Sequence, residues 1–143
     1  MDRHPACVRD ERAPRYQVLV EAPATWNTAV KQAARVSGGD VLFCGGPTSA
    51  HAGPCPLATG DGCPFVAAAD VVVHHLDLRR EENRAVLAAL RREHPRRPVV
   101  ALVWRPDAAA YAELLEGCEV VEFPWTVPKL RFALDAAAGR VCS

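Results

Sequence analysis

The feature that most constrains the fold of this chain is a regular alternation of short apolar runs with segments of helical spacing. The five apolar runs lie at 15–20, 40–44, 71–75, 98–104 and 119–123. Four of them are followed by segments in which apolar side chains recur every three or four residues, at 24–37, 80–94, 107–116 and 126–139. That spacing is typical of amphipathic helices. Strands that alternate with helices form a parallel sheet covered by helices on both faces, so the sequence predicts an α/β domain.

The length of the chain, 143 residues, is that of a single domain. We expect this domain at 15–139, with a flexible arm at 1–14 and a short tail at 140–143. No stretch approaches the roughly 20 apolar residues of a membrane span. The charged N-terminal segment also lacks the apolar core of a signal peptide. These features predict a cytoplasmic protein that does not bind membranes.

The net charge of the chain bears on whether it binds nucleic acid. The 17 acidic and 17 basic side chains cancel, whereas a nucleic-acid-binding domain is expected to carry a basic face. The sequence therefore predicts a protein that does not bind nucleic acid.

Several stretches share their order and spacing with a known family. The run 70–78 reads DVVVHHLDL, the segment after it contains VLAALRREHP, and PVVAL follows at 98–102. Pro124 comes after the last apolar run, before a final amphipathic segment. From Arg15 to Gly139 this pattern resembles the receiver domains of bacterial response regulators. The resemblance implies a three-layer, flavodoxin-like domain whose five parallel strands lie in the order 2-1-3-4-5.

The active site of that family is degenerate in this sequence. The resemblance implies an acidic pair that holds magnesium, a phospho-accepting aspartate, a threonine or serine, and a lysine. The matching positions hold Glu21 with Ala22, then His75, Val103 and Phe123. Without paired carboxylates a hard divalent cation loses its oxygen ligands, and without the lysine the phosphoryl charge is uncompensated. We therefore predict that this site does not carry out phosphotransfer.

Asp77 is the one alternative phosphate acceptor near this position. It lies two residues beyond His75, and a two-residue shift keeps a side chain on the same face of a strand. The missing partner residues argue against this alternative as well.

The cysteines form two groups in the expected topology. Six cysteines in a cytoplasmic chain favour free thiols, metal ligands or redox groups over a disulfide framework. Cys44 ends the second strand, and Cys55 and Cys63 lie in the long loop at 45–64. The other three lie in the tails or at the opposite edge of the sheet, at Cys7, Cys118 and Cys142. We expect only the first three to converge.

Four interpretations of the loop cysteines stay open. Cys44, Cys55 and Cys63, with His51 or His75, have suitable ligand chemistry for zinc or an iron–sulfur cluster. The two Cys-Pro dipeptides also resemble the heme-regulatory motif, in which a thiolate binds iron. A reversible disulfide between Cys55 and Cys63 is the third interpretation. In the fourth, Cys44 is a small buried hydrophobe and the loop thiols are inert.

The last elements are the candidate contact surface. The resemblance implies that the fourth helix, fifth strand and fifth helix form the output and dimer surface. We expect Tyr111, Leu114 and Trp125 to form an apolar face there that binds a protein partner or a second copy. Alternatively, the aromatic residues at the strand ends fill the vacated phosphorylation pocket.

The leading hypothesis is a stand-alone signalling protein that acts through protein contacts, without phosphorylation and without catalysis. The alternative is a metal-, heme- or thiol-redox-sensing protein that uses the loop at 44–63. A small enzyme with its site at the strand ends is the least supported hypothesis, because no set of residues argues for one.

Overall fold

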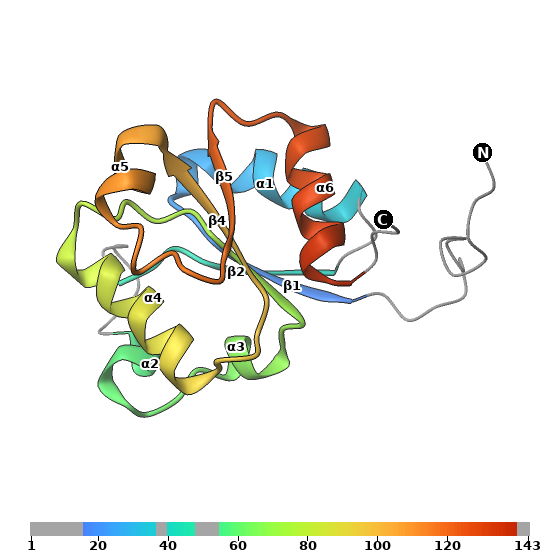
Figure 1. The fold of residues 1–143 in the computed structure, drawn as a ribbon. Coiled ribbons are helices and arrows are strands. Elements are labelled where there is room, and N and C mark those ends of the chain that lie inside the picture. Colours follow the sequence, from blue (N-terminus) through green and yellow to red (C-terminus); the bar gives the residue numbers. More distant parts are fainter. Residues whose placement is uncertain (1–15, 37–39, 48–54, 140–143) are drawn as a thin grey trace.

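The computed structural model describes residues 16–36, 40–47 and 55–139 (Figure 1). The predicted arm at 1–14 and tail at 140–143 lie outside this part of the chain. Among the described residues, no helix is long and apolar enough to cross a membrane.

Five parallel strands form one sheet in the order β2-β1-β3-β4-β5, which confirms the predicted fold class and strand order. The strands are β1 (Gln17–Glu21), β2 (Asp40–Cys44), β3 (Val71–His74), β4 (Val99–Trp104) and β5 (Glu119–Phe123). Glu21 at the end of β1 is in register with Cys44 on one side and His74 on the other. This register brings the three polar strand ends to the same edge of the sheet.

Helices cover both faces of the sheet, as Figure 1 shows. On one face α1 (Ala24–Val36) packs against α6 (Val127–Ala137). On the other face α2 (Pro56–Thr59) packs against α4 (Glu81–Glu93), with α3 (Pro64–Ala68) beside them. Thr126 caps α6, because its Oγ1 accepts a hydrogen bond from the Lys129 backbone N–H at 3.3 Å.

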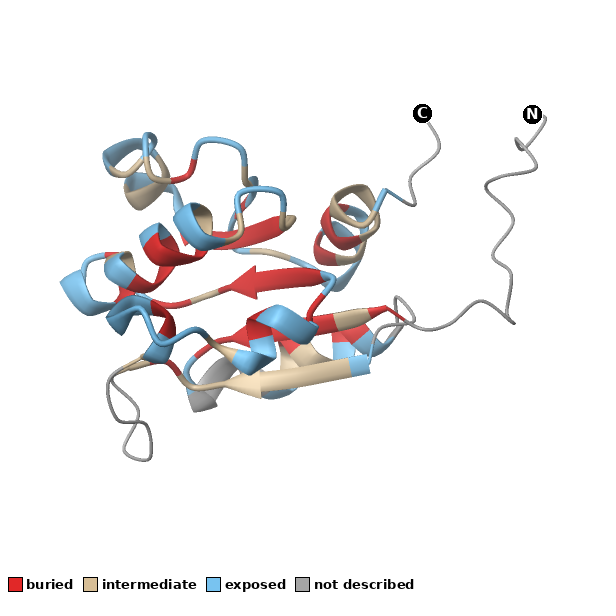
Figure 2. Ribbon diagram, turned by 90° about the horizontal axis from the view of Figure 1, so that it is seen from below, coloured by how far each residue is buried: buried red, intermediate tan, exposed pale blue. Residues whose placement is uncertain are grey.

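Alternate residues of the central strands face two separate apolar cores. Val18 and Val20 of β1 join the core beneath α1 and α6, whereas Leu19 joins the core beneath α2 and α4. Val71, Val72 and Val73 of β3 are all buried, as expected for a parallel strand covered on both faces. The edge strand β2 is only half-buried (Figure 2).

Two local predictions need correction, and proline explains both. The helix expected at 107–116 is instead α5 (Arg105–Ala110), which begins earlier because Pro106 fits the first turn, where no backbone N–H donor is needed. The irregular loop at 45–64 contains α2, and α3 follows directly after it. Each of these short helices has a cysteine at its N-cap and a proline next. The repeated Cys-Pro dipeptide therefore marks helix starts.

Candidate functional site

Two of the positions matched to the family's phosphorylation site, His75 and Val103, line a small cavity of about 120 Å³ at the carboxyl ends of β3 and β4. His75, Asp77, Val103 and Trp104 are among the residues that line it. In an open parallel sheet, ligands bind outside the carboxyl ends of the strands. This cavity is therefore where receiver chemistry would take place if the chain carried it.

His75, which the sequence matches to the family's phosphate acceptor, is held by two hydrogen bonds. Its backbone N–H donates to the Glu21 carbonyl at 2.7 Å, and its ring Nδ1–H donates to the Leu102 carbonyl at 3.2 Å. Burial lowers the pKa of the ring, the Leu102 carbonyl opposes that shift, and the neighbouring His74 adds to it. The imidazole is therefore neutral near pH 7.

The lowered pKa of His75 predicts that the protein loses stability as the pH falls. The unfolded chain binds a proton at this histidine more readily than the folded chain does. The contribution of the neutral His75 ring to the free energy of unfolding is therefore complete above about pH 6.5. It is lost as the pH falls below that value toward the pKa of His75 in the folded protein. Urea denaturation between about pH 5 and pH 8 measures the free energy of unfolding at each pH. This free energy should fall more steeply with decreasing pH in the wild type than in His75→Asn. Asparagine does not titrate, but it keeps a side-chain N–H that can donate to the Leu102 carbonyl. An NMR midpoint for His75 above about 6.5 would contradict this prediction.

Apolar side chains occupy the positions where the family has a hydroxyl and an ammonium group. Val103 is buried, and Phe123 is half-buried with its ring centroid 4.1 Å from that of Trp104. Trp104 lines the cavity and Phe123 does not, so the filling of the site by aromatic residues stays a prediction, but the arrangement is apolar. It provides neither a hydrogen-bond donor nor a positive charge for a phosphoryl group at these two positions.

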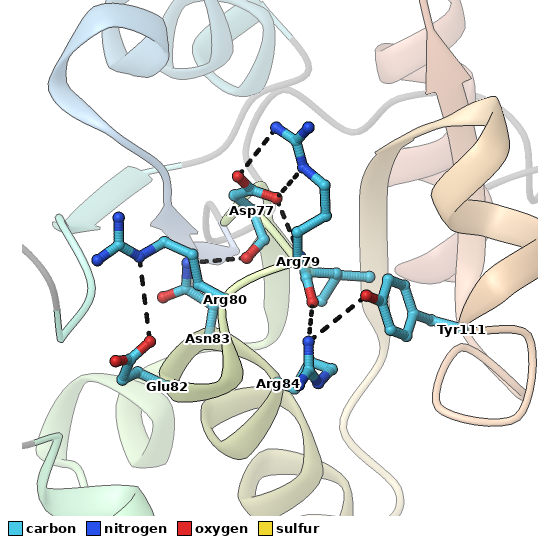
Figure 3. Close-up of polar contacts among 8 residues, drawn as sticks. Asp77, Arg79, Arg80, Glu82, Asn83, Arg84 and Tyr111 are labelled. Carbon is cyan, nitrogen blue, oxygen red and sulfur yellow. Dashed lines mark hydrogen bonds and ion pairs between the residues drawn. The ribbon is translucent and has the colours of Figure 1, made fainter.

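Asp77, the alternative acceptor, is already paired (Figure 3). Arg79 donates to its carboxylate through Nε at 3.0 Å, Nη2 at 3.1 Å and the backbone N–H at 3.0 Å. The hydrogen bonds from Arg79 lower the pKa of Asp77, so its carboxylate stays ionised. Phosphorylation of Asp77 would require release of this guanidinium.

Side-chain contacts also hold the loop that carries Asp77. Asn83 Nδ2 donates to the Asp77 carbonyl at 3.0 Å, and Arg84 Nη1 donates to the Leu78 carbonyl at 2.7 Å (Figure 3). The Arg84 guanidinium also lies over the ring of Tyr111, 5.3 Å from its centroid. The loop between β3 and α4 is thus tied to α4 and to the segment after α5.

Glu21, the one acidic residue at the acidic-pair position, does not line this cavity. Its Oε1 accepts a hydrogen bond from His74 Nδ1 at 3.0 Å. The two residues are 4% and 0% exposed, respectively. Sequence analysis did not pair them, although both lie at strand ends. With Glu21 engaged and Ala22 beside it, the site lacks the paired carboxylates that a magnesium ion needs.

A second, larger cavity of about 300 Å³ brings together three cysteines that the sequence predicts to converge. Cys44, Cys55 and Cys63 all line it, and Cys118 does not. Burial raises the pKa of the Cys44 thiol, against the opposing effect of the Gly46 backbone N–H, which donates to its Sγ at 3.4 Å. Burial also raises the pKa of Cys118, which lies near Arg91 instead.

The predicted metal site has no geometric support in the described residues. Within 16–36, 40–47 and 55–139, no three His, Cys, Asp or Glu side chains are placed to hold a metal ion. His75 lines the other cavity, and His51 lies outside the described residues. Cys44, Cys55, Cys63 and Cys118 are free thiols. Heme binding and a Cys55–Cys63 disulfide stay predictions.

Exposed apolar side chains occur close to the predicted contact surface but not at the predicted residues. Tyr111, Leu114 and Trp125 are half-buried and pack against the two cores. The large apolar side chains exposed in and beside β5 and α6 are instead Trp104, Val120, Val127 and Phe132. Val120 is exposed because β5 is an edge strand of the sheet. Alternation along this strand was the signal that could have identified it.

The groove beside these residues follows β5 and α6 and has a volume of about 640 Å³. Val120, Phe123 and Phe132 line it, together with the charged Arg105 and Lys129. Arg105 Nε, at the start of α5, lies 3.0 Å from Glu122 Oε2 of β5. This is a mixed surface, with an apolar centre and paired charges beside it.

Solved structures share this fold at low sequence identity. The response regulator receiver domain protein from Clostridium thermocellum superposes with a TM-score of 0.63 at 19% identity, over 89% of this chain and 96% of that one. The receiver domain of the sensor histidine kinase PA1611 from Pseudomonas aeruginosa, with magnesium coordinated in its active-site cleft, gives 0.64 at 13% identity, over 88% and 99%.

NtrX from Brucella abortus in complex with ADP gives a TM-score of 0.65 at 18% identity. The match covers 88% of this chain but only 27% of NtrX. No protein-family model matches the sequence, and neither does any curated protein. At these identities the likeness concerns the fold: the chain has the three-layer fold of response-regulator receiver domains.

Proposed function

We propose that this chain is a receiver-like regulatory protein that acts through protein–protein contacts, without phosphorylation and without catalysis. One observation carries the proposal: His75, which the sequence matches to the acceptor position, is a neutral histidine whose ring donates a hydrogen bond to the Leu102 carbonyl. The fold is that of signalling domains, but the acceptor position holds no carboxylate.

The surroundings of His75 support the same conclusion. Val103 and Phe123 supply no donor to a phosphoryl group, and Glu21 is turned toward His74. The PA1611 receiver structure has a magnesium ion in its active-site cleft. In this chain the residues at the acidic-pair position are a buried, engaged carboxylate and an alanine.

The proposed contact region is the β5–α6 surface, which we define by Trp104, Val120, Val127 and Phe132. These side chains are 50%, 41%, 39% and 67% exposed. Clusters of exposed large apolar side chains mark interaction sites more often than isolated ones do. Among the described strands, β5 lies at the edge of the sheet, and an exposed sheet edge can pair with a strand of another chain. Large aromatic side chains commonly supply most of the binding energy at such surfaces.

Replacing Phe132 by serine should weaken association, because it removes the most exposed aromatic ring of this surface. We expect about tenfold weaker binding, equivalent to about 1.4 kcal/mol, with an unchanged circular dichroism spectrum. Sedimentation velocity across a concentration series measures self-association, and pull-down measures a different protein partner.

The matched control is Phe65→Ser, which removes another exposed phenylalanine, from α3 and away from the β5–α6 surface. We expect this variant to associate like the wild type. Two results together would contradict the proposed surface: the wild type stays monomeric, and its pull-down profile is the same as that of Phe132→Ser.

A further inference from the structure

The proposed contacts make no use of the thiol cavity, which we define by Cys44, Cys55, Cys63, Leu57, Val66 and Glu21. The cavity lies at the carboxyl ends of β1 and β2 and is closed by α2, α3 and α4. Its volume of about 300 Å³ is at the lower end of the range for small-molecule pockets. Such pockets are mostly apolar, with a few fixed polar groups that orient the ligand.

The walls of the thiol cavity have this composition. Leu57 and Val66 are each 1% exposed and present aliphatic surface, and the three cysteines add soft, polarisable sulfur. Burial keeps the Cys44 thiol protonated and therefore uncharged. The cavity thus favours an apolar molecule with a polarisable surface, for which an aromatic ring is the simplest match.

Glu21 is the one charged residue among those that line the cavity. Its side chain is nearly completely buried, and the hydrogen bond from His74 to Oε1 fixes its orientation. A carboxylate has two oxygens that accept hydrogen bonds, so Oε2 can accept one from a molecule in the cavity. Because the walls of the cavity are apolar and burying a charge is costly, a neutral donor suits the site better than a cation.

From these observations we propose that the thiol cavity binds a small neutral aromatic molecule, of one or two rings, through a single N–H or O–H donor directed at Glu21. The rings pack against Leu57, Val66 and the cysteine sulfurs. The donor provides specificity, because a ligand without it leaves a buried carboxylate oxygen without its hydrogen bond.

Indole and 1-methylindole form a matched pair of probes for this site, because methylation removes the only N–H donor and keeps the rings. Isothermal titration calorimetry should show that indole binds at least about tenfold more tightly than 1-methylindole. Amide chemical shifts should change at Cys44, Gly46, Leu57 and Val66. No binding of indole, or equal binding of the two probes, would overturn the proposal.

Two variants test the location. Cys63→Phe fills the cavity and should abolish indole binding, whereas Cys118→Phe makes the same change at the start of β5 and should leave binding intact. Thermal unfolding confirms that each variant is folded. Unchanged binding by folded Cys63→Phe would overturn the proposal.

Alkylation of the wild type keeps the proposal testable if Cys63→Phe does not fold. Saturating indole should slow the reaction of Cys44, Cys55 and Cys63 with iodoacetamide and leave Cys118 unchanged, as followed by peptide mass spectrometry. Equal rates with and without indole would overturn the proposal. None of these measurements depends on the β5–α6 surface. The proposed ligand site and the proposed protein contacts are therefore tested independently.

Discussion

Acetyl phosphate with magnesium is expected to leave this protein unphosphorylated. In the match to the family, His75 stands for the acceptor carboxylate and Phe123 for the lysine, and Glu21 accepts a hydrogen bond from His74. Without these groups, neither the magnesium ion nor the transferred phosphoryl group is stabilised. Intact-protein mass spectrometry at neutral pH should show no added phosphate, and neither acid-stable nor acid-labile phosphate should be detected.

A receiver domain that is known to accept phosphate from acetyl phosphate serves as the positive control in the same buffer. His75→Asp tests whether the acceptor alone is missing. We expect this variant to stay unphosphorylated, since Val103 and Phe123 are unchanged. A phosphoryl adduct on His75 or Asp77 of the wild type would contradict phosphorylation-independent function.

Replacing Glu21 by alanine should cause a large loss of stability, because it leaves the fully buried His74 Nδ1–H without its acceptor. We expect the free energy of unfolding to fall by about 2–4 kcal/mol. The paired replacement Glu21→Leu with His74→Leu should recover most of that loss, because apolar side chains of similar size often replace a buried polar pair at little cost. Urea denaturation measures all these variants.

Asp77→Ala is the matched control for this prediction. It removes a carboxylate that also bonds a basic side chain, but at a solvent-exposed site (Figure 3). Exposed ion pairs contribute about 1 kcal/mol or less, so this variant should lose much less stability than Glu21→Ala. Equal losses in the two variants would show that the buried Glu21–His74 pair contributes no more than the exposed one.

The alternation of apolar runs and helical segments was enough to predict a parallel sheet covered by helices, and the resemblance to receiver domains implied its strand order. Parallel strands buried on both faces leave few other arrangements for such a pattern. The resemblance also matched His75, Val103 and Phe123 to the family's phosphorylation site, and that match stays a prediction. These features depend on order and spacing along the chain, which a sequence contains directly.

Only the tertiary structure decided which side chains meet. Glu21 and His74 lie 53 residues apart in the chain, and their hydrogen bond depends on the register between β1 and β3. The exposure of Val120 likewise depends on the place of β5, which is at the edge of the sheet that the described residues form. The convergence of Cys44, Cys55 and Cys63 followed from topology, but α2 and α3 enclose them in an apolar cavity. These contacts are set by strand register and by packing between segments that are distant in the sequence. The spacing of residues along one strand predicts only which face of that strand each residue occupies.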